Sequence, residues 1–226
     1  MCRANILRHS IALLGTVLLA GCLTIEEHYT FKKDGSGSMT YVVDMSGLGE
    51  MMNSFGDMGG TPQDDMGTMD LSAEVGRLKT VPGVSKVKLD AKKKWVQKIS
   101  FNFKDVTALN AALNELLKDS SGVRQDFFRW EDGTLVRSNN RHAHELGAGI
   151  AAGEDGGDDD EFGMNAMLES MKYRYSFKFA RPIGQVSSAD GVLRRTTGTK
   201  EIGLETDFAV ISRDPSALDL RITLDK

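Results

Sequence analysis

Several stretches of the chain alternate apolar and polar residues, a pattern that predicts strands with one buried face. Between Tyr173 and Phe179, aromatic side chains occupy every second position, and lysine, arginine or serine stands between them. The same period of two runs through 95–103 and 218–224. Strands with one buried and one solvent-exposed face are typical of antiparallel sheets. Further strand patterns lie at 26–33, 38–44, 84–90, 125–130, 134–136, 201–205 and 207–212.

Three segments show the spacing of amphipathic helices. Residues 71–78 place apolar side chains on one helical face, with Asp70 in position to cap the start. Residues 107–118 carry a stronger pattern, in which leucine and alanine recur at intervals of three and four. A short helix is expected at 162–171, after an acidic stretch that shows no period.

The order of these elements predicts an α+β fold. Asp34-Gly35-Ser36-Gly37 joins the first two strands as a hairpin. From 38 to 131 the order is strand, helix, strand, strand, helix, strand, which is the ferredoxin-like βαββαβ arrangement. Residues 82–89 also resemble the first half of heavy-metal-associated ferredoxin-like domains, without their Cys-x-x-Cys pair. We therefore expect antiparallel sheets with packed helices, a ferredoxin-like module and then a strand-rich C-terminal part.

The N-terminus carries the pattern of an export signal. Arg3 and Arg8 precede a short apolar stretch, which Leu19-Ala20-Gly21-Cys22 ends. These four residues resemble the lipobox of bacterial lipoproteins, and this resemblance implies a type II signal peptide and acylation of Cys22. An ordinary signal peptide that happens to end near a cysteine is the alternative. Acyl chains on Cys22 would attach the protein to a membrane of the cell envelope. Leu23, where inner-membrane lipoproteins usually carry aspartate, points to the outer membrane, facing the periplasm, in a Gram-negative host.

The remaining residues divide into parts of different composition. We expect a signal peptide at 1–21, the anchor and first hairpin at 22–44, a Met- and Gly-rich insertion at 45–70, a core part at 71–138, an acidic irregular linker at 139–163, and a helix with antiparallel strands at 164–226. Loss of 1–21 removes two of the 28 basic residues and none of the 32 acidic ones, so the balance becomes 26 − 32, or −6. This charge gives no reason to expect nucleic acid as a partner.

The methionines suggest a place for a ligand. Residues 45–69 hold six of the eleven methionines. Such a segment is a plain mobile loop, an adaptable apolar lid or partner surface, or a soft-sulfur site for Cu(I). A second group lies on the expected helix at 162–171. The hypothesis of an apolar ligand rests on six residues, which are Met51, Met52, Met58, Met164, Met167 and Met171.

Catalytic and metal-binding motifs are absent from the sequence. There is no Gly-x-Ser-x-Gly, His-Glu-x-x-His or phosphate-binding loop. His142 and His144 are interpreted as a solvated pair, and the acidic run at 154–161 as a hydrated loop, because neither has the spacing of a metal site. No cofactor is expected. A hydrolase with paired carboxylates would draw on Asp126, Glu131 and Asp132, which show no local signature.

These features together predict a lipid-anchored envelope protein whose domain is a non-catalytic binding or interaction module, with an apolar ligand or lipid as its first candidate partner. A structural or assembly scaffold of the envelope is the alternative, and an unrecognised hydrolase is the third. The lipobox, the early Asp-Gly-Ser-Gly turn and the strand-rich end are together similar to LppM-like envelope lipoproteins.

Overall fold

The largest element of the structure is a seven-stranded sheet. The computed structural model describes residues 23–50, 70–118, 120–152 and 161–225. The strand order in this sheet is β3 (Val84–Asp90), β4 (Val96–Phe103), β2 (Gly37–Asp44), β1 (Thr24–Phe31), β7 (Lys172–Phe179), β10 (Glu201–Asp207) and β9 (Leu193–Gly198). Neighbouring strands are antiparallel except β1 and β7, which run parallel in register from Thr24↔Lys172 to Phe31↔Phe179.

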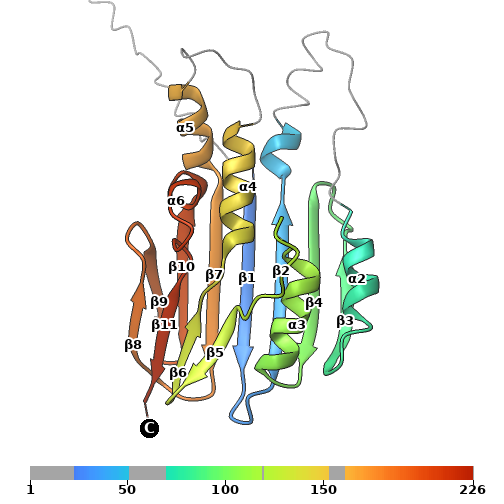
Figure 1. The fold of residues 1–226 in the computed structure, drawn as a ribbon, viewed down its shortest axis with the longest axis vertical. Coiled ribbons are helices and arrows are strands. Elements are labelled where there is room, and N and C mark those ends of the chain that lie inside the picture. Colours follow the sequence, from blue (N-terminus) through green and yellow to red (C-terminus); the bar gives the residue numbers. More distant parts are fainter. Residues whose placement is uncertain (1–22, 51–69, 119, 153–160, 226) are drawn as a thin grey trace, which may run out of the picture.

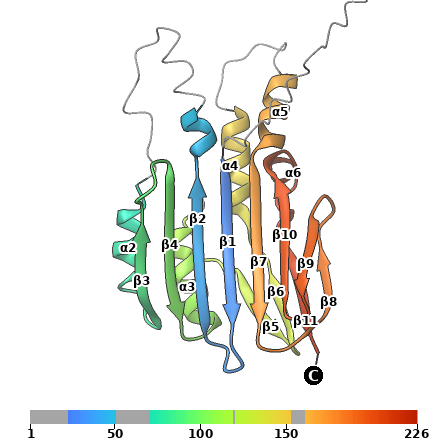
Figure 2. The ribbon, with the colours of Figure 1, turned by 180° about the vertical axis from the view of Figure 1, so that it is seen from behind.

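A second, four-stranded sheet packs against one face of the first. Its order is β5 (Phe128–Glu131), β6 (Thr134–Arg137), β11 (Leu220–Leu224) and β8 (Ile183–Ser188). Figure 2 shows the large sheet from its other face, which no helix or strand of the described residues covers. The strand patterns agree, since β1, β2 and β7 alternate buried residues with half-buried or exposed ones. The core therefore lies between the two sheets.

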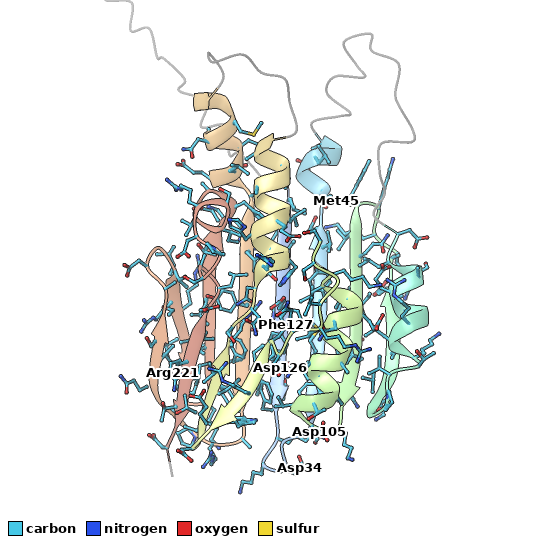
Figure 3. The ribbon with its side chains drawn as sticks, viewed as in Figure 1. Asp34, Met45, Asp105, Asp126, Phe127 and Arg221 are labelled. Atoms are coloured by element: carbon cyan, nitrogen blue, oxygen red, sulfur yellow. The ribbon has the colours of Figure 1, made fainter. Side chains whose placement is uncertain are left out.

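The helices lie on the same side as the small sheet. α3 (Val106–Leu116) packs under α2 (Ser72–Leu78) beside β3 and β4 (Figure 1). α4 (Arg141–Ala152), α5 (Glu161–Ser170) and α6 (Phe208–Arg213) gather at the end of the large sheet where β1 begins. The β1–β2 turn lies at the opposite end, as Asp34 and Met45 mark in Figure 3. Within the described residues, no helix is both long and apolar enough to cross a membrane.

The expected α+β class and the strand-rich C-terminal part are confirmed, but the ferredoxin-like module is only partly formed. Strands β2, β4 and β3 are paired as that arrangement requires. The strand expected as the fourth, β5, lies in the small sheet instead. The reason is that β1 occupies the free edge of β2 over eight residue pairs. The sheets are antiparallel as expected except at the β1–β7 pair, which is parallel.

The structure differs from the sequence pattern in two segments, 139–163 and 207–212, which contain helices. The irregular linker expected at 139–163 contains α4, whose Ala143 is buried and whose Gly147 faces α6, where a Cβ would lie 3.4 Å from Phe208. The strand expected at 207–212 is α6. Its start is capped by Asp207, whose carboxylate accepts a hydrogen bond from the Val210 N–H at 3.0 Å. Strands β8 and β9 were not predicted.

Candidate ligand-binding pocket

An open pocket of about 850 Å³ lies at the end of the molecule where the β1–β2 turn, the β5–β6 turn and the end of β7 meet. It is at the lower end in Figure 1, beside the Asp34 label of Figure 3. Its wall contains both aromatic and basic side chains. The lining residues are Phe31, Lys32, Lys33, Asp34, Gly35, Trp130, Gly133, Phe179, Ala180, Arg181 and Leu224.

Three aromatic rings form the apolar part of this pocket. The Phe31 and Phe179 rings are stacked with their centroids 5.5 Å apart, and the Trp130 ring meets them edge-on at 5.9 Å and 6.3 Å. Both phenylalanines are buried, whereas Trp130 is 36 % exposed. A large aromatic side chain held partly in water at the mouth of a pocket is a common anchor for an apolar ligand.

The strand register explains why these rings meet. Phe31 ends β1 and Phe179 ends β7, and the parallel register places the two residues opposite each other. Side chains alternate between the faces of a strand, so both rings point into the layer between the sheets. Trp130 reaches the same layer from β5. Each phenylalanine is followed by basic residues, in Phe31-Lys32-Lys33 and Phe179-Ala180-Arg181.

The rim of the pocket is basic. Lys32, Lys33 and Arg181 form no side-chain hydrogen bond and no ion pair with the described part of the chain. The one carboxylate on the rim is Asp34, which accepts hydrogen bonds from the Ser36 hydroxyl at 2.7 Å and the Ser36 N–H at 3.1 Å. These bonds lower the pKa of Asp34 and direct its carboxylate toward Ser36 within the turn.

A separate polar cluster lies buried between the two sheets. The Glu27 carboxylate accepts hydrogen bonds from the Arg137 guanidinium, from the Tyr29 hydroxyl at 3.0 Å and from the Tyr173 hydroxyl at 2.6 Å. Arg137 also donates to the Asn140 side chain at 2.8 Å. Glu27 belongs to the large sheet and Arg137 to the small one, so this ion pair joins the sheets across the core.

Both charges of this cluster are stabilised in their ionised forms. Burial raises the pKa of Glu27, but the charges of Arg137 and His142 and the Tyr173 hydrogen bond outweigh it, and the net pKa is lowered. Burial alone would lower the pKa of Arg137, but the Glu27 charge raises it. Burial raises the pKa of Tyr175 to about 12. The Glu27–Arg137 pair is thus a structural link between the two sheets.

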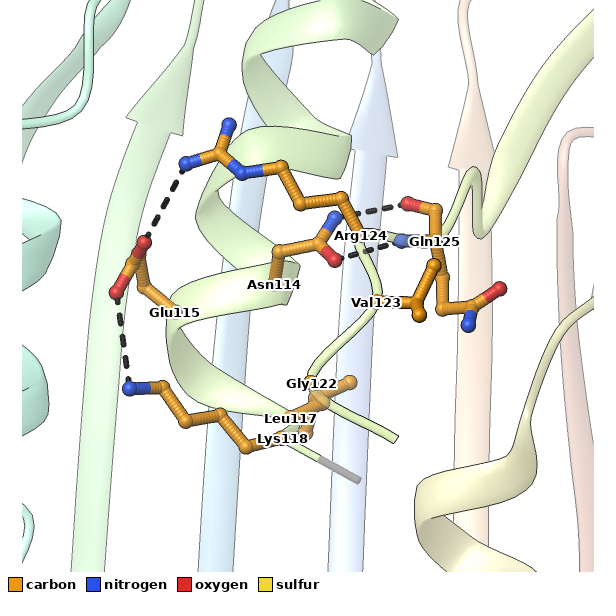
Figure 4. Close-up of a pocket in the computed structure, with 8 residues that line it drawn as sticks. All are labelled: Asn114, Glu115, Leu117, Lys118, Gly122, Val123, Arg124 and Gln125. Carbon is orange, nitrogen blue, oxygen red and sulfur yellow. Dashed lines mark hydrogen bonds and ion pairs between the residues drawn. The ribbon is translucent and has the colours of Figure 1, made fainter. Parts of the chain in front are cut away.

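A second pocket, of about 250 Å³, lies at the C-terminal end of α3 (Figure 4). Its charges are already paired, because Glu115 contacts Arg124 at 3.8 Å and Lys118 at 4.0 Å. The Asn114 side chain holds the backbone of Gln125 through two hydrogen bonds of 2.7 Å and 2.8 Å. This pocket is built from the contacts that fasten the 122–125 segment to the helix.

A third hollow, of about 400 Å³, lies on the open face of the large sheet. There His28 lies between Ser176 at 2.8 Å and Glu26 at 3.2 Å, in the order of a serine hydrolase triad. The His28 side chain is 47 % exposed, and the strand backbones beside it are paired on both sides of β1, so they leave no free N–H groups for an oxyanion. These three side chains bind one another along the exposed face of the sheet.

The methionines predicted as a ligand site are only partly described. Met51, Met52 and Met58, like Cys22, lie outside the described residues. Met164 and Met167, on α5, are half-buried against the core, and Met171 is buried in it. None of these last three lines the pocket at the end of the sheets. The structure therefore gives them a packing role and leaves the ligand hypothesis for them as a prediction.

The other predicted residues are dispersed. Glu131 is held by Arg221 and Arg129 at 2.7 Å each, and these bonds lower its pKa, which does not suit a general acid. Asp126 lies in the segment before β5 and Asp132 in the β5–β6 turn. His142 faces the Tyr173 hydroxyl at 3.5 Å, and His144 is on the same helix. No group of three metal-ligating side chains occurs within the described ranges.

The pocket residues were missed because no single motif contains them. The sequence pattern predicts Lys32, Lys33, Trp130 and Phe179 as strand residues and assigns Arg181 to no element. The signal in the sequence was the repeated order of a phenylalanine at the end of a strand and then basic residues.

Comparison with known proteins adds one structural likeness. No protein family matches the chain, and no curated protein matches it. The fold is similar to the NMR structure of the folded domain of LppM from Mycobacterium tuberculosis, over 93 % of this chain and 95 % of that one. The sequence identity is 10 % and the TM-score is 0.48. At these values the function of that protein does not transfer to this chain.

Proposed function

We propose that this chain is a lipid-anchored envelope protein whose domain binds a small apolar or amphipathic ligand in the end pocket, without catalysis. The observation that carries the proposal is the aromatic wall formed by Phe31, Phe179 and Trp130, with the Trp130 ring 36 % exposed at the mouth. Ligand pockets are typically concave, of 300–1,000 Å³, and lined mainly by apolar and aromatic groups.

The place of the pocket fits an anchored receptor. Leu23 and Thr24 lie at the end of β1 opposite Phe31. With a rise of about 3.3 Å per residue, the strand separates its two ends by about 23 Å. In this proposal an acylated Cys22 holds the domain at the bilayer, and the pocket opens on the side away from that attachment. The protein would then receive its ligand from the aqueous side or from another envelope component.

The test uses the chain from Leu23 onward, which contains every described helix and strand. The variant Trp95→Phe leaves Trp130 as the single tryptophan, since the chain has two. Titration with 1-dodecylglycerol below its aggregation concentration is expected to shift the Trp130 emission to the blue and to saturate, because the ring becomes desolvated.

Two variants control this experiment. Trp130→Asp is expected to weaken binding of dodecylglycerol, measured by calorimetry, at least tenfold, because it removes the exposed ring from the pocket wall. Leu193→Asp makes the same kind of change at an apolar residue that is 62 % exposed and not in the pocket, and should leave affinity unchanged. Absence of saturable binding, or equal loss in both variants, would contradict the proposal and favour an envelope scaffold.

A further inference from the structure

We infer that the ligand of the end pocket carries a phosphate-type anionic head group, bound by Lys32, Lys33 and Arg181, with its apolar part against the aromatic wall. This inference rests on the proposed function and assigns the chemical class of its ligand. Its support is the set of basic residues on the rim, whereas the support for the proposed function is the aromatic wall.

The local charge is the first argument. The rim holds three cations and the single carboxylate of Asp34, so its formal charge is 3 − 1, or +2. The chain as a whole is acidic, with a formal net charge of −4. A positive pocket in an acidic protein concentrates anions at that place, and a phosphate monoester supplies up to two negative charges.

The second argument is that these cations are free to take a ligand. Several lysines and arginines elsewhere in the fold are held in ion pairs, as in Lys172 with Asp207 and Arg174 with Glu205. The rim cations have no such partner within the described residues. Asp34 is close in sequence and feels the charge of Lys32, but its carboxylate is hydrogen-bonded to Ser36 in its own turn and forms no ion pair with a rim cation of the described residues. An anion entering the pocket would therefore not have to break an existing ion pair.

Arg181 gives the strongest single contact. Its side chain is half-buried, and its Nη2 atom lies 4.0 Å from the position that a Cβ on Gly133 would take. The guanidinium therefore lies beside the β5–β6 turn, within van der Waals distance of that position. A guanidinium that is partly removed from water gains most from a charge-assisted bidentate bond, and phosphate oxygens match its planar donors.

The rim is also held in place before any ligand binds. The Ala180 N–H donates to the Phe31 carbonyl at 3.2 Å, and the Leu224 N–H donates to the Gly133 carbonyl at 3.1 Å. These bonds fix the end of β7 to β1 and the β5–β6 turn to β11. Binding then loses less conformational entropy, because the backbone segments that carry the cations are already ordered.

The experiment uses calorimetry at low and moderate salt on the chain from Leu23 and compares three probes, which are dodecyl phosphate, 1-dodecylglycerol and inorganic phosphate. Dodecyl phosphate is also titrated in the presence of excess inorganic phosphate, which should weaken its binding. Dodecyl phosphate is expected to bind at least tenfold more tightly than dodecylglycerol at low salt. That advantage should shrink as salt rises, because screening weakens exposed charges. In Lys33→Gln/Arg181→Gln the advantage of dodecyl phosphate over dodecylglycerol should fall to less than about threefold. Lys88→Gln/Lys98→Gln, away from the pocket on β3 and β4, is the matched control and should keep the advantage.

Each other outcome has a distinct meaning. Equal affinity for dodecyl phosphate and dodecylglycerol, both lost in Trp130→Asp, would overturn this inference and leave the proposed function standing. Inorganic phosphate binding as tightly as dodecyl phosphate would overturn the amphipathic ligand and assign the rim to free phosphate. No saturable binding of any probe would overturn the inference and the proposed function together.

Discussion

At the scale of single residues, the interior is organised around the buried pair of Glu27 and Arg137. Removing one partner of such a pair leaves a charge without compensation, which typically costs 3–5 kcal/mol. We therefore expect Glu27→Gln to lower the free energy of unfolding by about this amount, measured by urea denaturation of the chain from Leu23. Glu205→Gln, which weakens the more exposed pairs with Arg174 and Arg195, should cost far less.

The same variant has a pH signature whose sign follows from the pKa of Glu27. The net pKa is lowered below its ordinary value of 4.5, so the folded state favours the ionised form. The stability from this group is present above pH 4.5 and is lost as the pH falls through the folded-state pKa. The stability difference between the natural chain and Glu27→Gln should therefore be constant near neutral pH and narrow at acidic pH. A difference that grows on acidification would contradict the assignment.

At the scale of elements, two asparagines on α3 decide where β5 lies. Asn110 accepts a hydrogen bond from the Phe128 N–H and donates to the Phe128 carbonyl, both at 2.8 Å. One helical turn later, Asn114 binds the backbone of Gln125 in the same way. The helix thus replaces a neighbouring strand at the free edge of β5. These contacts hold β5 in the small sheet, while β1 occupies the edge of β2 that the fourth ferredoxin-like strand would need.

Asn110→Ala tests this role. The substitution leaves the N–H and the carbonyl of buried Phe128 without partners, which should lower the free energy of unfolding by about 1–3 kcal/mol. Hydrogen exchange at the Phe128 amide should become faster than the loss of global unfolding free energy alone would predict, because the contact is local. Asn165→Ala, at an exposed position of α5, should change neither quantity. Equal effects of the two substitutions would exclude a special role for Asn110.

The elements also show what the sequence could predict. Strands such as β7 and the helix α3 were predicted because one face is buried and the period is strong. The helix α4 was missed because its histidines and glycines dilute the apolar positions, although Ala143 is buried in the core. The pocket could not be predicted, since Phe31, Trp130 and Arg181 come together only through the parallel β1–β7 pair and the docking of β5 on α3.

At the scale of the whole molecule, the expected anchor determines where the domain works. Expressed in a bacterium that processes lipoproteins, the natural chain should fractionate with membranes, and mass spectrometry should find a diacylglyceryl-modified Cys22 as its first residue. Cys22→Ser should release the protein from the membrane fraction or leave it unprocessed. Cys2→Ser changes the other cysteine of the chain, inside the expected signal, and should keep the modification. A soluble natural chain with an unmodified Cys22 would contradict the anchor.

The pocket and the methionine helix lie at opposite ends of the molecule, so the position of a bound ligand distinguishes them (Figure 1). The most direct measurement is a titration of the isotopically labelled chain from Leu23 with 1-dodecylglycerol, followed by the amide and indole signals in two-dimensional NMR. Our account predicts saturable shifts at residues 31–35, the Trp130 indole, Gly133 and Arg181. Shifts concentrated at 164–171, or no saturable shifts, would contradict it.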